Sequence, residues 1–323
     1  MMHSVTSYGV LVHDWGFLHE VVEFARPFRM PDFFLISGLF LSRTINAPLR
    51  DYIDKKVLHF IYFYLIWLVI EMVIVEVDLL RTDPLAFVRL FFFALVEPYE
   101  TMWFVHMLAI FYAVTRLVRR VPVVVVFLAA AALQTLYHLE IINTGWSVID
   151  RFCDRYVFFF VGYAAAARIF AFAQLAGARP PWTLALLLVW GVANWLGVQA
   201  GLHDAPGTSL VMGFIGAGAI VAISVLLSQL KFTSLLRHAG ANSIVVYLTF
   251  FLPLKLMHKL FFVTGIMPDT GWVSAITTTV AVATPLIFHH FIKNTPLNFL
   301  YVRPARFRIV PMRGSQPAAA SNL

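Results

Sequence analysis

The sequence predicts an all-α protein that crosses a membrane several times, and three observations lead to this fold class. Hydrophobic residues make up 60% of the 323 residues and charged residues only 13%, whereas soluble domains carry roughly 25% charge. The mean hydropathy is +0.81. Apolar runs of about 20 residues, the length that crosses a bilayer core, recur along the whole chain. The composition therefore predicts a bundle of about nine or ten transmembrane helices.

Nine spans follow from the hydropathy pattern, each bounded by polar residues or by prolines and glycines. We expect them at 30–46, 57–77, 101–118, 121–139, 155–173, 182–200, 208–229, 242–263 and 271–292. The apolar segment Pro84–Val96 is shorter and lies between charged residues such as Arg81 and Glu97. It is therefore expected to form a surface or re-entrant helix.

The basic residues orient these spans, because cytoplasmic loops of membrane proteins are enriched in Lys and Arg. With residues 13–27 outside, 16 of the 24 basic residues fall on the inner side: Arg43, Arg50, Lys55, Lys56, Arg116, Arg119, Arg120, Arg168, Arg179, Lys231, Arg237, Lys293, Arg303, Arg306, Arg308 and Arg313. The C-terminus is then cytoplasmic. The net charge of +7 fits basic loops beside anionic membrane lipid, and no nucleic-acid partner is expected.

Two parts of the chain are distinguished by composition. Residues 1–310 form the integral-membrane domain, and the small and polar residues of 311–323 are expected to be a disordered cytoplasmic tail. Met1–Val12 is apolar but too short to cross a bilayer, so we expect it to continue a first helix that begins upstream. The lone cysteine, Cys153, permits no internal disulfide, and no Cys/His spacing indicates a metal site.

Ionisable side chains inside the spans are candidate site residues, because each costs about 2.5–3.5 kcal/mol on insertion scales. Arg29 lies at the outer mouth of the first complete span, with Arg26 one helical turn earlier. Together they could hold a carboxylate or phosphate or polarise a carbonyl oxygen; the alternative is snorkelling to the interface. Asp32 follows Arg29 by three residues and could be its ion-pair partner.

Further candidates line the outer half of the predicted bundle. Glu71 lies deep in its span, where it is either a functional group or a structural partner of a basic side chain. His106 lies about one turn inside a span and could be catalytic or simply hydrogen-bonded to a neighbouring helix. Trp103 is either a substrate platform or an aromatic-belt residue. His3 could take a proton from a hydroxyl, since imidazole has a pKa near 6.5.

Four cations, Arg43, Arg50, Lys55 and Lys56, fall in one short inner loop. Such a group suits an anionic cytosolic ligand such as a coenzyme A phosphate. Anionic lipid headgroups are the alternative of equal weight.

Together these segments resemble integral-membrane acyltransferase family 3, especially its subgroup similar to fucose 4-O-acetylases and nodulation-factor acetyltransferases. Four motifs carry the resemblance in order along the chain: Phe28–Gly38 (FRMPDFFLISG), Met102–Leu108 (MWFVHML), Gly240–Leu248 (GANSIVVYL) and Pro296–Pro304 (PLNFLYVRP).

The resemblance implies transfer of an acyl group, usually acetyl from acetyl-CoA, to a hydroxyl of a surface or exported glycan. It implies a ten-helix bundle in the bacterial inner membrane with no bound cofactor. His3 matches the family histidine that would act as general base or carry the acyl group, and Arg29 would stabilise the oxyanion or position the acceptor. Lys55 and Lys56 match a basic patch, which strengthens the coenzyme A interpretation.

The chain departs from the family pattern at two places. The arginine that relatives carry about ten residues before the histidine would lie upstream of Met1. Many relatives also have a histidine shortly after the late Tyr-Leu pair, where this chain has Thr249 and Phe250. Two other classes stay open from the residues alone. They are a transporter or flippase of a lipid-linked glycan, which would also need intramembrane charge, and an accessory or sensory protein whose polar residues hold helices together.

Overall fold

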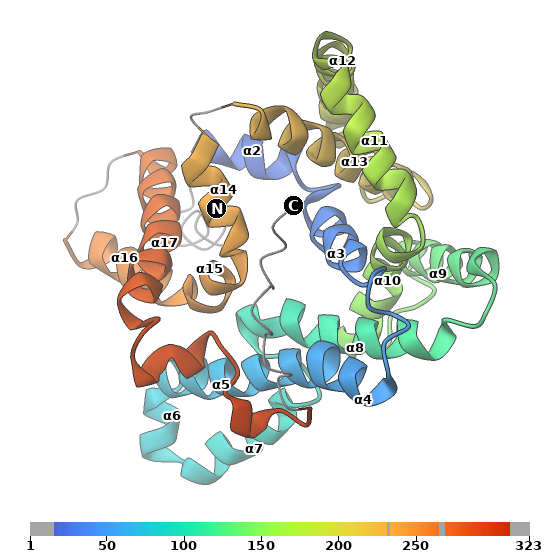
Figure 1. Cartoon of the computed structure of the whole chain (residues 1–323). Coiled ribbons are helices and arrows are strands. Elements are labelled where there is room, and N and C mark those ends of the chain that lie inside the picture. Colours follow the sequence, from blue (N-terminus) through green and yellow to red (C-terminus); the bar gives the residue numbers. More distant parts are fainter. Residues whose placement is uncertain (1–15, 231–232, 265–268, 311–323) are drawn as a thin grey trace, which may run out of the picture.

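The computed structural model describes residues 16–230, 233–264 and 269–310, and within these ranges it contains helices and no strand. The predicted all-α polytopic fold class is confirmed. His3 and the tail over 311–323 lie outside the described residues. Figure 1 shows the helices arranged around the middle of the molecule.

Five helical segments among the described residues are long and apolar enough to cross a membrane. The first runs over Leu49–Val75 and joins α4 (Leu49–Tyr52), the π-helical turn η1 (Ile53–Val57) and α5 (Leu58–Val75); the second runs over Glu100–Val118 and joins η2 (Glu100–Met102) and α8 (Trp103–Val118). The others are α12 (Pro180–Gln199), α13 (Thr208–Ser228) and α17 (Thr270–Ile292).

Two further spans are bent, which raises the number to as many as seven within the described ranges. α10 (Ser147–Ala164) and α11 (Ala166–Ala178) meet at 76°. α15 (Ser243–Thr249) and α16 (Phe251–Thr264) meet at 49°. Pro253 accounts for the second bend, because a proline ring clashes with the carbonyl four residues earlier and lacks an N–H donor.

Two of the nine expected spans are shorter helices than predicted. α3 (Arg29–Leu39) has 11 residues and α9 (Val123–His138) has 16, which at 1.5 Å per residue gives about 17 and 24 Å. The hydrocarbon core measures about 30 Å. The segment expected to be a surface or re-entrant helix forms α7 (Pro84–Ala94), which is also short.

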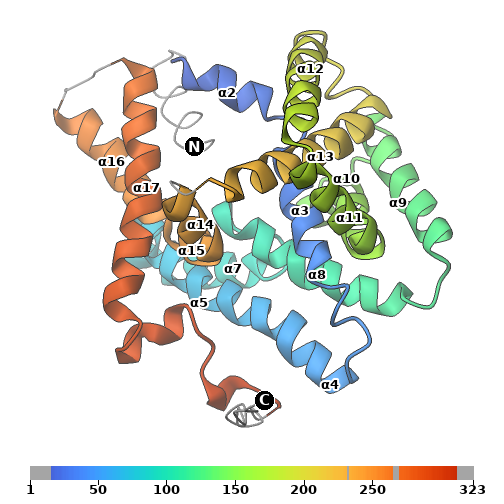
Figure 2. The ribbon, with the colours of Figure 1, turned by 45° about the horizontal axis from the view of Figure 1, so that its top comes forward.

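The remaining helices are short connections and surface elements. They are α2 (Leu18–Phe24), α6 (Val77–Thr82), α14 (Ser234–Ala241), η4 (Pro296–Leu300) and η5 (Ala305–Phe307). Figure 2 shows α11, α12 and α13 grouped on one side of the molecule, with α16 and α17 on the opposite side.

Glycines allow a close backbone contact between α3 and α10. A Cβ atom at Gly38 would lie 2.1 Å from the carbonyl oxygen of Phe159, and one at Gly162 would lie 2.0 Å from that of Leu35. Backbones can approach this closely only where no side chain intervenes. The two glycines therefore hold the second half of α3 beside α10.

Candidate active site

Three arginines from α3 and α10 form a cationic group, which we call the Arg29 cluster: Arg29, Arg151 and Arg155. Arg155 is the charged side chain that interacts most strongly with Arg29, and it also interacts with Arg151. The guanidinium atoms Nε and Nη1 of Arg29 and Nη1 of Arg151 are buried with no hydrogen-bond partner in the described part of the chain. Buried donors are normally paired, so their geometry favours an anion or a developing negative charge at this place.

Trp103, at the start of α8, forms one wall of the Arg29 cluster. The Arg151 guanidinium lies 4.8 Å from the centroid of the Trp103 ring, a cation–π distance. The Trp103 ring in turn packs 6.0 Å from Phe34 of α3. The tryptophan thus contacts the cationic group directly, and an aromatic-belt position alone does not describe it.

A hydrogen-bonded network holds the Arg155 side chain in place. Arg155 Nε lies 2.7 Å from Asp154 Oδ2, and Asp154 Oδ1 lies 3.2 Å from His138 Nε2. His138 Nδ1 lies 3.0 Å from the carbonyl oxygen of Asp204. Asp154 is almost fully buried. The network therefore ties the cluster to α9 and to the loop before α13.

Arg26 and Asp32 are placed differently from what their spacing suggested. Arg26 is exposed and forms ion pairs with Glu23 at 3.4 Å and Asp204 at 3.1 Å, so it does not clamp a ligand together with Arg29. Asp32 makes no ion pair with Arg29 within 4.0 Å, and its Oδ1 atom is buried without a hydrogen-bond partner among the described residues. Asp32 lies near the cluster as an additional acceptor.

His106 of α8 is held in one orientation by a backbone carbonyl. Its Nε2 atom lies 3.2 Å from the carbonyl oxygen of Leu95. A carbonyl only accepts, so Nε2 carries the proton and Nδ1 is the acceptor nitrogen of the neutral ring. Nδ1 is buried and has no partner in the described ranges, and the ring interacts electrostatically with Glu97 and Arg151. His106 therefore has a free proton-accepting nitrogen near the Arg29 cluster.

Glu71 of α5 is fully buried and has a structural partner. The Thr101 hydroxyl lies 3.1 and 3.2 Å from its two carboxylate oxygens. The same turn is held by the Tyr247 hydroxyl, which donates to the carbonyl oxygen of Thr101 at 2.5 Å. Glu71 joins α5 to η2, the turn that immediately precedes Trp103. This arrangement favours a structural role for Glu71 over a chemical one.

A second group, which we call the Lys56 cluster, consists of the cations Lys56, Arg303 and Arg308 and the nearby His59. His59 interacts electrostatically with the other three. Arg303 is buried, and its Nη2 atom lies 2.7 Å from Asp54 Oδ1. Its Nε and Nη1 atoms are buried without a partner in the described residues. Lys56 and its neighbour Asp54 lie in the π-helical turn η1, a geometry that recurs at functional sites.

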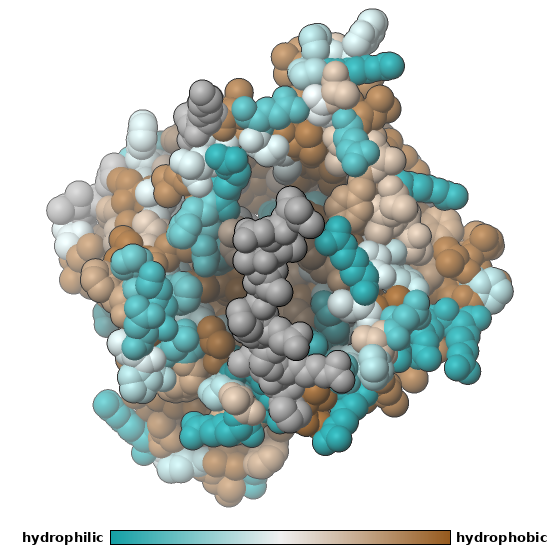
Figure 3. Space-filling view, in the orientation of Figure 1, coloured by the Kyte–Doolittle hydropathy of each residue, from teal (hydrophilic) through white to brown (hydrophobic). Residues whose placement is uncertain are grey.

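The four cations of the predicted coenzyme A site do not stay together. Lys56 lies 5.3 Å from the ring of Tyr112 in α8, whereas Arg43 lies 5.9 Å from the ring of Phe170 in α11. Lys55 is exposed, 4.0 Å from Asp51, and Arg50 is exposed as well. Arg303 and Arg308 take part in the cluster instead; Arg303 lies in the closing Tyr-Val-Arg-Pro motif, and Arg308 follows that motif. Figure 3 shows hydrophilic side chains over the ends of α4 and α8, on the face seen in Figure 1.

The helix α8 connects the two clusters. Trp103 contacts the Arg29 cluster and Tyr112 contacts Lys56. Nine residues separate them, which is about 14 Å along a helix axis. α3 runs beside this stretch, since the Tyr112 hydroxyl donates to the carbonyl oxygen of Ser37 at 3.1 Å. The two clusters therefore lie about three helical turns apart along α8.

Comparison with known families decides what kind of protein carries these clusters. The model of an acyltransferase domain family, the family that the four motifs resemble, matches residues 1–289. The chain belongs to this acyltransferase family. The comparisons with curated proteins and with solved structures found no match.

Membership makes the protein a membrane acyltransferase, because the family match and the apolar spans cover the same residues. In the described ranges no three His, Cys, Asp or Glu side chains come close enough to hold a metal ion.

Proposed function

We propose that this acyltransferase transfers an acyl group, acetyl by preference, from acyl-CoA to a hydroxyl of a surface or exported glycan in the bacterial inner membrane. The observation that carries the proposal is the pair of cationic clusters in contact with one helix, α8, each with buried guanidinium nitrogens that lack a partner in the described chain. Two anionic or charge-developing groups can then be held about 14 Å apart along α8. A group transfer between two bound substrates needs both to be held in a fixed mutual orientation.

Acyl-CoA is assigned to the Lys56 cluster. The phosphates of coenzyme A suit the Lys56 ammonium and the arginines, because charge-assisted hydrogen bonds to phosphate are the strong ones. The predicted orientation places this cluster at the cytoplasmic side, where acyl-CoA is available. Of the four cations first expected, Lys56 keeps this role, and Arg303 and Arg308 join it.

The Arg29 cluster is assigned to the reacting centre and the acceptor. The glycan hydroxyl oxygen attacks the thioester carbonyl carbon, the C–S bond breaks, and the coenzyme A thiolate takes up the proton that the hydroxyl loses. Arg29 would stabilise the oxyanion on the carbonyl oxygen with its unpartnered Nε and Nη1 atoms. Arg151, stacked on Trp103, would orient the sugar.

The proton requires a base, and two histidines are candidates. His3 is assigned by resemblance and lies outside the described residues. His106 is the described residue with the required chemistry, because its Nδ1 atom is a free acceptor. The two assignments predict different variants to lose the proton-transfer step, so they can be told apart directly.

The proposal is tested with membranes that contain the protein, labelled acetyl-CoA and glycan extracted from a deletion strain. We expect transfer of label to the glycan and restoration of the acetyl groups missing from the polysaccharide of the deletion strain. Absence of the whole polymer in that strain, with no transfer of label, would instead indicate a transporter of lipid-linked glycan. An unaltered polysaccharide and no transfer would indicate an accessory protein.

A further inference from the structure

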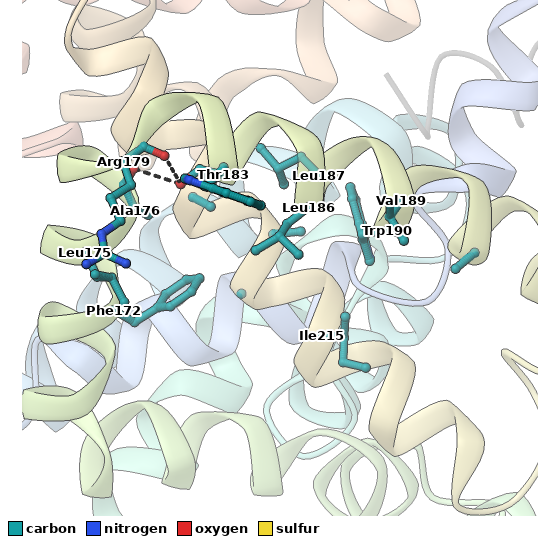
Figure 4. A pocket seen from close by; sticks show the side chains of 15 residues that line it. Phe172, Leu175, Ala176, Arg179, Thr183, Leu186, Leu187, Val189, Trp190 and Ile215 are labelled. Atoms are coloured by element: carbon teal, nitrogen blue, oxygen red, sulfur yellow. Dashed lines mark hydrogen bonds between the residues drawn. The ribbon is translucent and has the colours of Figure 1, made fainter.

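A cavity of about 800 Å³ lies between α11, α12 and α13, apart from both clusters. Figure 4 shows its wall of aliphatic and aromatic side chains, with Arg179 beside Leu175 and Phe172 at one end. The volume lies within the roughly 300–1,000 Å³ of small-molecule sites. The cavity opens to the outside of the bundle, where α12 has most of its leucines exposed.

The wall of this groove is apolar apart from Arg179, Thr183 and the indole N–H groups of Trp182 and Trp190. Thr183 is the one hydroxyl side chain in its wall, and its Oγ1 atom donates to the carbonyl oxygens of Ala176 at 2.9 Å and Arg179 at 3.1 Å. Those bonds are the dashed lines of Figure 4. An occupant of the interior is therefore hydrocarbon, because a polar group there would lose its hydrogen bonds to water.

The groove is longer than one leaflet of a bilayer and shorter than the whole hydrocarbon core. Its wall on α12 extends from Arg179 to Ala193, which is about 21 Å of helix, and one leaflet provides about half of a 30 Å hydrocarbon core. Trp190 closes the far part by packing 5.3 Å from Phe28, the residue before Arg29. The groove thus runs from Arg179 toward Trp190, whose ring contacts the residue before Arg29.

The charged end of the groove carries the positive charge of Arg179, and no carboxylate of the described residues forms an ion pair with it. Arg179 is exposed and takes part in none of the seven ion pairs of the described residues. A neighbouring cavity of about 220 Å³ shares Phe172 and Gly218 with the first and is lined by Arg168, near the start of α11. The exposed Arg179 at one end of an apolar groove complements a ligand with an anionic head and an apolar tail.

We propose that this groove is a binding site for an anionic phospholipid of the membrane, with one acyl chain between α11, α12 and α13 and the phosphate at Arg179. The site is separate from acyl transfer and does not depend on the proposed substrates. The lipid covers the apolar faces that the short α11 leaves open beside α12.

The test uses the purified full chain in detergent with dioleoyl-phosphatidylglycerol or dioleoyl-phosphatidylcholine, and native mass spectrometry counts the retained lipids. We expect one phosphatidylglycerol to be retained about fivefold better than phosphatidylcholine, the ratio that corresponds to about 1 kcal/mol for one basic residue. Arg179→Gln should bring the ratio close to one while both lipids still bind.

Two glycines provide the matched pair that tests the groove itself. A Cβ at Gly218, in the wall of both cavities, meets nothing within 4 Å, and the same is true of Gly191 on α12, which lines neither. Gly218→Phe should fill the groove and reduce lipid retention at least fivefold, whereas Gly191→Phe should not. Gly218→Leu provides a smaller filling change if the phenylalanine variant fails to fold.

Three outcomes would overturn the proposal. The first is equal retention by the Gly218 and Gly191 variants, which would place the lipid elsewhere. The second is equal retention of the two lipids by the unaltered chain, with no effect of Arg179→Gln, which would indicate annular lipid without a site. The third is a co-purified polyprenyl phosphate that phosphatidylglycerol does not displace, which would assign the groove to a lipid-linked glycan.

Discussion

Arg29 is the residue on which the proposed chemistry depends most. Two of its guanidinium nitrogens are buried and unpartnered in the described chain, so their N–H groups are available to a developing oxyanion. Removal of one oxyanion donor costs about 10²–10³ in kcat in well-studied hydrolases. We expect Arg29→Ala to lower kcat by this amount, with partial recovery in Arg29→Lys, measured as transfer of label from acetyl-CoA.

Arg26 is the matched control for that experiment. It lies one turn before Arg29, carries the same charge and is exposed, and its guanidinium is paired with Glu23 and Asp204. Exposed pairs contribute roughly 0–1 kcal/mol, so Arg26→Ala should change the rate only a few fold. Equal losses in the two variants would show that charge at the helix mouth, and no specific donor, is required.

His106 gives the second prediction at the scale of the residue. Its Nε2 proton is committed to the Leu95 carbonyl, which leaves Nδ1 to accept a proton. His106→Gln can keep a donor toward Leu95 and removes the basic nitrogen. If His106 is the base, the variant should lose about 10²–10⁴ in kcat with an unaltered KM for acetyl-CoA, and His3→Gln should be far milder.

A large loss of kcat in His3→Gln with a mild effect of His106→Gln would assign the role of general base to His3. A change confined to thermal stability in His106→Gln, with kcat intact, would leave His106 as a residue that joins α8 to the end of α7. Both variants are compared in the same membranes and at the same expression level, so the ratio of their rates decides between the assignments.

At the scale of the element, the pair of glycines between α3 and α10 determines where Arg29 stands relative to Arg155. A methyl group at Gly162 would lie 2.0 Å from the Leu35 carbonyl oxygen, a rigid backbone atom. Gly162→Ala should therefore separate the helices and lower both the thermal midpoint of the purified protein and its transferase rate. Gly191→Ala, where the added methyl meets nothing, should leave both unchanged. Equal midpoints would mean that α3 and α10 can move apart without cost.

The positions of the long helices were predictable from the sequence, whereas their bends and some of their ends were not. Hydropathy located the long spans well, because length and apolar content are local properties. The 76° bend at Ala165 has no proline there to indicate it, and the bend depends on how α10 packs against α3. α3 ends at Leu39, although the apolar pattern continues, because the chain then turns toward α4.

The candidate site was predictable only in part for the same reason. Arg29 and Trp103 were identifiable because charged and aromatic residues at a span mouth are unusual. Arg151 and Arg155 are near the start of a span, where they look like ordinary loop charges. The pairing of Arg303 with Asp54 joins residues 249 positions apart, and no local pattern in a single sequence contains it.

At the scale of the whole molecule, that buried pair attaches the C-terminal segment to the first long span. Asp54 Oδ1 accepts from Arg303 and also from the backbone N–H of Ile309 at 2.9 Å. Removal of one partner of a buried pair destabilises by about 3–5 kcal/mol. Asp54→Ala should therefore lower the thermal midpoint and raise the KM for acetyl-CoA, because the Lys56 cluster loses Arg303. Asp51→Ala, at an exposed pair with Lys55, is the control, and an equal effect there would contradict the argument.

The two clusters contact α8 at different heights, so the molecule has two distinct sides. If the basic side is cytoplasmic, the Lys56 cluster faces the cytoplasm and the Arg29 cluster the opposite side. Inverted membrane vesicles should then consume added acetyl-CoA, whereas sealed right-side-out vesicles should not until a detergent opens them. Lys56→Gln should raise the KM for acetyl-CoA in the inverted vesicles with little change in kcat, and Arg151→Gln should raise the KM for the glycan instead. Consumption of acetyl-CoA by sealed right-side-out vesicles would reverse the orientation and exchange the roles of the two clusters.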